Sequence, residues 1–366
     1  MLAAVAGCGN GARPTAAQST AATQQPGERL VNVYNWEDYI APDTVAKFER
    51  ATGIKVQYDV FDGNEVLETK LLTGHTGYDV VVPSAYFLER MARQGVFQPL
   101  DRSQLSNYGE LDPKIMAMLA VNDPGNRYAV PYMWLTIGFA YNVAAIREAL
   151  GDVAIDSWAF IFDPQYAARL KHCGLVMLDA PTDVLDAVRL YLGIDPNSED
   201  LAELERTAAA LRRVRPYVYN FRSLYTSELA NGEICMVLGY SGDLLQARDL
   251  ARQAGKGVDI RYVIPKEGAT LAIDTLAIPA DAPHPDTAHA FINFILRPEI
   301  AAEISDFRRY ANANAGALKL VDPELRADPG IYPPPEILAR LHPRRAESLE
   351  FARREHRAWV RIRSDR

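Results

Sequence analysis

The chain has 366 residues, of which 48% are hydrophobic, and it carries a formal net charge of −8 at pH 7. A chain of this size can bury a large core, so we expect two lobes rather than one small domain. The acidic balance argues against nucleic acid as a partner and favours cations. Because no run of about 20 apolar residues occurs, no membrane-spanning segment is predicted.

The chain begins with small, apolar residues that lead to a cysteine. Val5-Ala6-Gly7-Cys8 resembles the lipobox of bacterial lipoproteins, whose cysteine is lipidated after the signal is cleaved. The basic part and most of the apolar part of a signal are missing, so the natural start can lie upstream, and a chance apolar start is the alternative. We expect lipidation at Cys8, a flexible tether up to residue 28 and a periplasmic location.

The turn at residues 34–40 is the most unusual part of the chain. A short strand rich in β-branched residues precedes it at 30–33, and Pro42 begins a helix that stops at Gly53. Ring faces attract cations, and carboxylates accept charge-assisted hydrogen bonds from them, so the turn is suited to an organic ammonium. The alternative is that the two rings only cap the core beneath a loop. The side chains concerned are Trp36, Glu37, Asp38 and Tyr39.

The next elements alternate between strand and helix patterns. Residues 54–60 alternate as a half-buried strand, and Asn64 is placed to cap a helix that ends at Gly74. Residues 78–83 form an apolar strand, and Ser84 caps the helix that follows. This order predicts an open α/β sheet, in which ligands bind beyond the carboxyl ends of the strands.

A long apolar, extended segment at residues 128–142 exceeds an ordinary strand in length and predicts a crossing between lobes. Beyond it, apolar strands at 175–178 and 234–238 each lead into a helix. Residues 260–264 and 271–278 are interpreted as the return crossing. The chain ends in a basic helix, which we interpret as a solvated helix face rather than a docking site.

Two cysteines remain after Cys8, namely Cys173 and Cys235. In an exported protein such a pair favours one disulfide, whereas in a cytosolic protein the two would be free thiols. Because we expect export, we predict the bridge.

Acidic and aromatic side chains recur where the predicted strands end, in both halves of the chain. A single acid at a strand end is usually a helix cap or a turn residue, but repeated buried carboxylates cost free energy unless they are paired. Few basic residues stand at the same turns, so we expect a ligand to supply the positive charge. The residues at strand ends are Trp36, Glu37, Asp38, Tyr39, Ser84, Tyr86, Asp183, Tyr240 and Asp243, and Asp274 joins them from inside the return crossing.

Several segments, in this order, resemble the periplasmic putrescine/spermidine-binding proteins of bacterial ABC transporters over nearly the whole chain. They are YNWEDYI at 34–40, VPSAYFL at 82–88, VPYMW at 130–134, LDAP at 178–181, PKEG at 265–268, YANAN at 310–314 and RAW at 357–359. The resemblance implies an α/β fold of the type II periplasmic binding protein class, with two lobes of mixed sheets joined by a hinge of crossing strands. We expect residues 29–131 with 270–312 in the first lobe and 132–269 with 313–366 in the second.

The resemblance also implies which residues hold the ligand and what the protein does with it. Trp36, Asp38, Tyr39, Ser84, Asp183, Asp243, Asp274 and Tyr310 would line a polyamine site, with Glu37, Tyr86 and Tyr240 beside them. It suggests the bridge between Cys173 and Cys235 as well. The protein would deliver its ligand to ABC permease subunits as a monomer that needs no cofactor and touches the membrane only through its lipid.

The chain departs from this pattern at three places. Glu37 replaces Ser or Thr, Tyr240 stands where Trp is usual, and Ala272 with Ile273 occupies a stretch where putrescine binders place Phe. Loss of a large ring leaves room for a longer ligand, and Glu37 adds a further ammonium partner. Both changes favour a triamine such as spermidine, or mixed specificity, unless Ile273 refills the space or Glu37 points to solvent.

Other functions stay open at this point. An enzyme on the same fold has little support, because G-x-S-x-G, H-E-x-x-H and G-x-x-x-x-G-K-[ST] motifs are absent, and no catalytic residue is predicted. His284 and His289 are interpreted as loop and helix-surface residues rather than metal ligands, and aromatic rings among the acids do not suit a hard cation. A polyamine sensor acting on a signalling partner is not distinguished from a transport protein.

Overall fold

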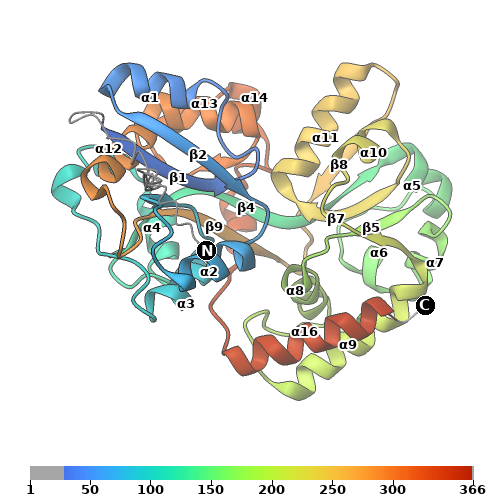
Figure 1. The fold of residues 1–366 in the computed structure, drawn as a ribbon. Helices are drawn as coiled ribbons and strands as arrows, with labels where there is room; N and C mark the ends of the chain where they lie inside the picture. The colour runs from blue at the N-terminus through green and yellow to red at the C-terminus, as the bar shows by residue number, and fades with distance from the viewer. Residues whose placement is uncertain (1–28, 365–366) are drawn as a thin grey trace, which may run out of the picture.

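The computed structural model describes residues 29–364, which form two α/β lobes (Figure 1). Cys8 and the expected tether lie outside the described residues. The strands are β1 Leu30–Trp36, β2 Lys55–Phe61, β3 Val80–Val81, β4 Ala129–Asn142, β5 Leu175–Met177, β6 Val218–Phe221, β7 Met236–Tyr240, β8 Ile260–Val263, β9 Ala269–Ala277, β10 Ala311–Asn312 and β11 Leu341–Pro343.

The helices are α1 Thr44–Thr52, α2 Asn64–Thr73, α3 Ala85–Ala92, α4 Pro113–Leu119, α5 Val143–Leu150, α6 Ala159–Phe162, α7 Pro164–Leu170, α8 Pro181–Tyr191, α9 Leu201–Val214, α10 Thr226–Asn231, α11 Ser241–Ala254, α12 Pro285–Ile295, α13 Pro298–Arg308, α14 Pro323–Ala327, α15 Pro335–Leu338 and α16 Leu349–Ser364. Short 3-10 turns are η1 Arg102–Gln104, η2 Tyr108–Glu110, η3 Arg215–Tyr217 and η4 Ala317–Lys319. None of the helices within residues 29–364 is long and apolar enough to cross a membrane.

One mixed sheet runs through both lobes in the order β2-β1-β3-β9-β4-β7-β5-β6, with β8 and β10 also pairing with β4, and β11 with β9. The outer pairs in each lobe, such as β1 with β2 and β5 with β6, are parallel, whereas β9, β4 and β7 pair antiparallel. In Figure 1, β1 and β2 lie with α1 and α12 in one lobe, and β5, β7 and β8 lie with α10 and α11 in the other.

Strand β4 joins the two lobes. It is a single strand of 14 residues, buried throughout, as a crossing segment must be. Residues 129–136 pair with β9, whereas residues 137–142 pair with β7 and β8. The predicted crossing at 128–142 is therefore confirmed, and its length is explained because its two halves belong to different lobes. The register shifts between Pro131 and Met133, where proline lacks the N–H that a regular ladder needs.

The return crossing is β9, which pairs antiparallel with β4. The short strand β10 also pairs with β4, at Trp134 and Met133. The expectation that residues 260–264 also belong to the return crossing is wrong. This segment forms β8, which pairs with the second half of β4 and stays in the second lobe.

Helix α1 ends as expected at Gly53, which has the left-handed conformation with φ of 68°, but it begins at Thr44 after Asp43 at the N-cap position, and not at Pro42. His289 was expected on a helix surface, and this is wrong. It is 3% exposed, and its Nε2 accepts a hydrogen bond from the backbone N–H of Asp101 at 2.9 Å. His289 therefore ties α12 to the loop before η1, because its ring fits between them.

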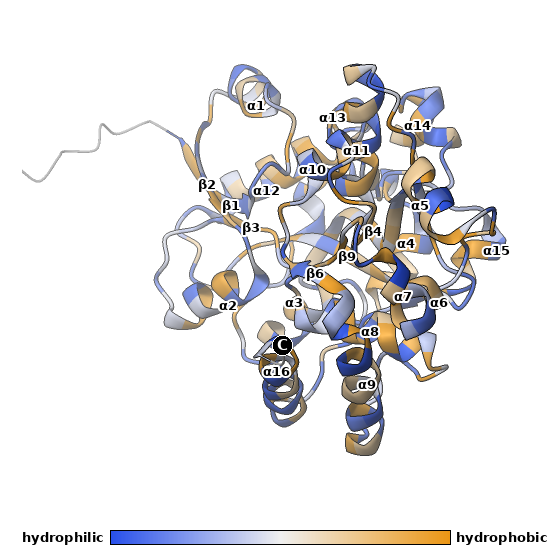
Figure 2. Cartoon of the chain, turned by 90° about the vertical axis from the view of Figure 1, so that its right-hand side faces the viewer, coloured by the Kyte–Doolittle hydropathy of each residue, from blue (hydrophilic) through white to orange (hydrophobic). Residues whose placement is uncertain are grey.

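The last part of the chain contacts both lobes. Val321 and Leu325 are buried in one cluster with Ala301 and Ala302 of α13, whereas α16 packs on α8 and α9. Residues 317–325 thus lie against α13, which differs from the expected assignment of all of 313–366 to the second lobe. Figure 2 shows mostly hydrophilic residues on the outward side of α16.

The predicted bridge is present. Cys173, after α7, and Cys235, before β7, form a disulfide with their Cα atoms 5.3 Å apart. The bridge links the segment between α7 and β5 to the start of β7, which pairs with β5 in the sheet.

Candidate functional site

Three aspartates become the centre of the candidate site: the sequence places two of them after strands and the third inside the predicted return crossing. Asp274 lies within β9, which belongs to the crossing strands, while Asp183 and Asp243 lie in the first turns of α8 and α11 in the second lobe. Each accepts a hydrogen bond from a tyrosine hydroxyl, and among the described residues none of the three forms an ion pair with Lys, Arg or His.

Asp274 is the most deeply buried of the three, at 4% exposure. Its Oδ2 accepts a hydrogen bond from the Tyr39 hydroxyl at 2.7 Å, and its Oδ1 accepts one from Ser84 Oγ at 2.6 Å. Burial raises the pKa of the Asp274 carboxyl to about 6, although both hydrogen bonds act in the opposite direction. A charged carboxylate in this position lacks a positive partner, which makes it a strong candidate to bind a cation.

Asp243 and Asp183 repeat the arrangement in a half-buried setting. Tyr310 donates to Asp243 Oδ1 at 3.0 Å, and Tyr240 donates to Asp183 Oδ2 at 2.8 Å. Burial raises the pKa of both carboxyls. Burial also raises the pKa of the two tyrosine hydroxyls, so they stay protonated and act as donors. The three carboxylates therefore share one chemistry: each accepts a hydrogen bond from a tyrosine hydroxyl and forms no ion pair among the described residues, so each can accept a charge-assisted hydrogen bond from a ligand.

Aromatic rings from the turn at residues 36–39 connect to this group. Trp36 donates from Nε1 to the carbonyl oxygen of Val82 at 2.8 Å, which holds the indole against β3. The Tyr39 ring lies edge-on to those of Tyr310 and Tyr132, with centroids 5.4 Å and 5.6 Å away. Such contacts fix the ring of Tyr39 and so the direction of its hydroxyl.

Glu37 and Asp38 are not brought into the buried group. Both side chains are exposed, and Asp38 has a left-handed backbone with φ of 54°. The strand ends at Trp36, so the two acids occupy the outer side of the turn while Tyr39 points inward. The sequence pattern alone could not separate the inward from the outward residues of an irregular turn.

Asn64 and Ser84 were both predicted to cap helices, and this is wrong for their side chains. The N-cap position of α2 is Gly63, and no side-chain cap bond is formed by Ser84 at α3. Instead, Asn64 accepts from the backbone N–H of Ser84 at 3.1 Å and donates from Nδ2 to Ser84 Oγ at 3.0 Å. Asn64 thus orients the Ser84 hydroxyl, which donates to Asp274. The sequence did not indicate this role, because Asn64 follows a glycine at a predicted helix start.

The strand β9 also decides what lies beside Asp274. Ala272 is half-buried and, because side chains alternate along a strand, it shares a face with Asp274. Ile273 lies on the opposite face, packed in a cluster with Trp134 and Ala311. The suggestion that Ile273 refills the space left by a missing Phe is therefore wrong, because its side chain points to the other side of the sheet.

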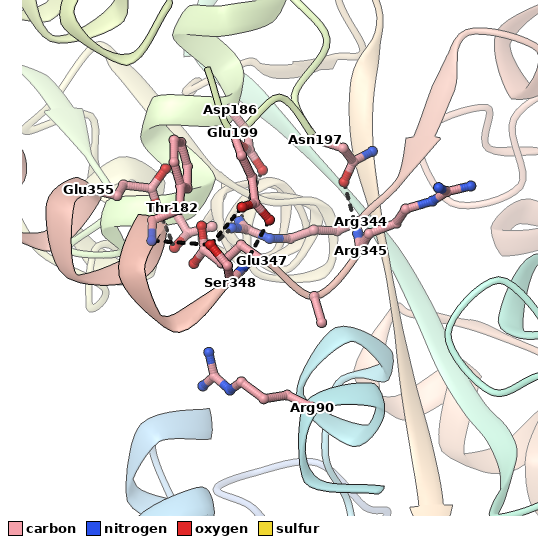
Figure 3. A network of polar contacts seen from close by, with 12 residues as sticks. Arg90, Thr182, Asp186, Asn197, Glu199, Arg344, Arg345, Glu347, Ser348 and Glu355 are labelled. Atoms are coloured by element: carbon pink, nitrogen blue, oxygen red, sulfur yellow. Dashed lines mark hydrogen bonds and ion pairs between the residues drawn. The ribbon is translucent and has the colours of Figure 1, made fainter. Parts of the chain in front are cut away.

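A network of charged residues near the site joins α8 to two distant parts of the chain, which the sequence did not reveal. Asp186 binds Arg189 at 2.6 Å through Oδ1 and Arg344 at 2.9 Å through Oδ2, and Arg189 also binds Glu355 at 2.7 Å. Figure 3 shows Arg344 beside Asp186, and Thr182 donating a hydrogen bond to Glu355 at 3.1 Å. The network satisfies its own charges and leaves Asp274 and Asp243 without an ion pair.

Tyr86 lies next to this network. Its half-buried ring has the guanidinium carbon of Arg344 4.8 Å from its centroid. The positive charge of Arg344 lowers the pKa of Asp183, against the larger effect of burial, which raises it. The Asp183 end of the site therefore differs electrostatically from the Asp274 end.

The basic end of the chain is only partly a solvated face. In α16, Arg363 binds both oxygens of Asp179, four residues before Asp183, at 2.7 Å and 2.8 Å, whereas Arg361 is exposed and forms no ion pair among residues 29–364. We expect Arg363→Glu to lower the free energy of unfolding by up to about 1 kcal/mol, the upper range for an exposed pair. Arg361→Glu, in the same helical turn, is the control and changes it little. Urea denaturation of both variants measures the difference, and equal effects would show that the pair contributes nothing.

The described residues contain no cluster of three or more His, Cys, Asp or Glu side chains that could hold a metal ion. The candidate site thus consists of carboxylates, hydroxyls and aromatic rings.

Comparisons with known proteins agree with this arrangement. A family model described as bacterial extracellular solute-binding protein matches residues 43–333. The chain is 48% identical over 340 residues to the putrescine-binding periplasmic protein PotF of Escherichia coli, covering 92% of each, and 47% identical over 353 residues to the putrescine-binding periplasmic protein SpuD of Pseudomonas aeruginosa, covering 96% of each.

Solved structures give the same answer for the fold. A putative spermidine/putrescine ABC transporter protein from Listeria monocytogenes superposes with a TM-score of 0.82 at 32% identity, covering 93% of this chain and all of that one. The substrate-binding protein PotD from Streptococcus pneumoniae gives a TM-score of 0.78 at 28% identity, covering 92% of this chain and 98% of that one. The α/β fold with two lobes, expected from the sequence, is confirmed, and the chain belongs to the bacterial extracellular solute-binding proteins.

Proposed function

We propose that the protein captures a polyamine, putrescine or spermidine or both, between its lobes and delivers it to the permease subunits of an ABC transporter. The observation that carries this proposal is the set of three carboxylates held by tyrosine hydroxyls without an ion pair. An ammonium group supplies the charge that these carboxylates lack. The names of the relatives point to the same ligand class.

The ligand lies extended in this proposal. Its ammonium groups bind Asp274 on the crossing strands and Asp243 and Asp183 in the second lobe. Closure around the ligand excludes water, which strengthens each of these contacts. The methylene groups pack against aromatic side chains, and the other assigned residues position the carboxylates or lie at the edge of the site. The full set is Trp36, Glu37, Asp38, Tyr39, Ser84, Tyr86, Asp183, Tyr240, Asp243, Asp274 and Tyr310.

Further parts of the proposal concern the whole protein. We assign residues 29–131 with 270–312 to the first lobe and most of the remainder to the second, with residues 317–325 packed against α13 of the first. The protein acts as a monomer, is anchored in the periplasm through lipid on Cys8, and has no catalytic residue.

A calorimetric screen tests the proposal with matched pairs of ligands. Putrescine and ornithine differ by a carboxylate, as do cadaverine and lysine. We expect each diamine to bind and each amino acid to bind at least 100-fold more weakly, because a ligand carboxylate is repelled by the three acids. Spermidine, spermine and agmatine complete the screen. Equal binding of diamines and amino acids, or no binding of any amine, would overturn the proposal.

The proposal also concerns which length of polyamine the site prefers. Ala272 has a small side chain on the same face of β9 as Asp274, so we propose that spermidine binds at least as well as putrescine. Putrescine binding more than about 10-fold tighter, a difference of about 1.4 kcal/mol, would contradict this preference and leave the polyamine class unaffected.

Ligand affinity should depend on pH through Asp274. Its carboxyl, with a pKa of about 6, must be charged to bind an ammonium, whereas the ligand amines stay protonated throughout this range. We expect affinity to be constant above pH 7 and to fall by up to about tenfold per pH unit below pH 6. Titrations at pH 7.5, 6 and 5 measure this dependence. A pH-independent affinity would contradict it.

In the ligand-free protein, the contribution of Asp274 to the free energy of unfolding changes with pH in the opposite direction to the affinity. Because the native carboxyl binds its proton more tightly than the unfolded one, whose pKa is near 3.8, Asp274 stabilises the fold at low pH. This contribution is lost as the pH rises through about 6. Denaturation of the parent and of Asp274→Asn without ligand separates this effect from binding.

A further inference from the structure

The ring of Tyr310 lies directly on the first turn of α11, at Gly242. A Cβ atom built on Gly242 would stand 2.3 Å from Cζ of Tyr310 and 2.4 Å from its Cε1 and Cε2, far inside any normal contact. Gly242 is buried and has no positive φ, so its backbone conformation does not require glycine. Glycine inside a helix costs about 0.5–1 kcal/mol relative to alanine. The absence of a side chain is thus explained by the contact with the ring.

This contact places Tyr310 between the two lobes. The residue precedes β10 on the crossing strands, its hydroxyl donates to Asp243 at 3.0 Å, and its ring lies edge-on to Tyr39. Tyr39 in turn donates to Asp274 at 2.7 Å. A continuous path of contacts therefore leads from the start of α11 in the second lobe to the buried carboxylate on β9.

The ring of Tyr310 has little freedom to move away. It is 5% exposed and is enclosed by Tyr39, by α11 and by its bond to Asp243. A methyl group at position 242 would push the ring by about 1 Å to reach a normal contact distance of about 3.5 Å. Displacements of that size at a binding or catalytic group are expensive.

We propose that Gly242 is a positioning residue for ligand binding: by lacking a Cβ atom it lets Tyr310 lie on α11, where it sets the spacing between Asp243 and Asp274. The inference rests on the proposed function, because it names a determinant of polyamine affinity. Gly242 touches Tyr310 and acts on the ligand only through it.

A double-mutant cycle tests this inference with spermidine and putrescine as ligands. Gly242→Ala is made in the parent and in a Tyr310→Ala background, where the ring that the methyl would strike is gone. We expect Gly242→Ala to weaken binding at least tenfold in the parent and less than twofold in the Tyr310→Ala background. Gly109→Ala, at a glycine with no atom within 4 Å of the added Cβ, is the control and leaves affinity unchanged.

The melting temperature without ligand is the second readout. Gly242→Ala should lower it by several degrees in the parent but not in the Tyr310→Ala background, a coupling that needs no ligand. Equal losses of affinity in both backgrounds, or a Gly242→Ala variant that binds within twofold of the parent, would overturn the inference. If the parent binds no polyamine, the proposed function fails, and the coupling in melting temperature still decides whether the methyl group strikes Tyr310.

Discussion

Asp274→Asn weakens polyamine binding by about 2–5 kcal/mol, because an ammonium group in a closed site loses its charged partner. Asparagine keeps the size of the side chain and can still accept a hydrogen bond from Tyr39, so the loss reports the charge rather than the packing. Asp243→Asn lies towards the lower end of this range, because Asp243 is only half-buried. Isothermal titration with spermidine and putrescine measures both.

Glu37→Ser is the matched control for this series, because it removes an acid from the same expected site at an exposed position. Water already solvates Glu37, so the change should cost well under 1 kcal/mol. The carboxylate assignment would be wrong if all three variants bound within twofold of the parent.

Removal of the disulfide lowers the free energy of unfolding by about 4 kcal/mol. The bridge joins residues separated by 62 positions, and opening a loop of that length gives the unfolded chain this much additional conformational entropy in the chain-entropy model. The variant is Cys173→Ser with Cys235→Ser, and denaturant titration of the variant and the parent measures the change.

Reduction of the parent with a thiol reagent is the control for the two serines, because it breaks the bond without altering the sequence. Reduced parent and double variant should unfold at similar denaturant concentrations. Intact-mass analysis of native protein that shows two free thiols at these positions would remove the prediction.

Much of the fold was predictable because it depends on local patterns. The helix ending at Gly53 requires only an amphipathic stretch and a glycine that adopts positive φ. The crossing at 128–142 could be recognised because an apolar extended segment of that length has to be covered on both sides. The acids at strand ends were likewise visible, since strands of one sheet end at shared edges.

The segment at 260–264 shows a limit of the sequence pattern: it predicts a strand but not the lobe to which the strand belongs. Its residues are compatible with any strand, and only pairing with the end of β4 decides that it stays in one lobe. The partner of a strand is not written in its own residues, because backbone hydrogen bonds carry no side-chain identity.

Within the site, the sequence by itself determined the chemistry: carboxylates, tyrosines and a tryptophan near strand ends, which suit an organic cation. The tertiary structure decided which of them act together. Asn64 and Ser84 are residue types that often cap helices. In the structure, the Ser84 hydroxyl donates to the buried carboxylate of Asp274 and accepts from Asn64 instead. This arrangement is favoured because an unsatisfied buried charge costs more free energy than an uncapped helix.

Tertiary packing also decides which charged residues are buried and which of them form ion pairs. Glu37 and Asp38 stay in water while Asp274 is buried, and Arg344, more than 150 residues beyond Asp186, arrives to pair with it. Charge is visible in a sequence, but burial and the distance between charges depend on the packing of remote segments. The sequence therefore determined the ligand class that this site suits, and only the tertiary structure decided which carboxylates lack an ion pair and are left for the ligand.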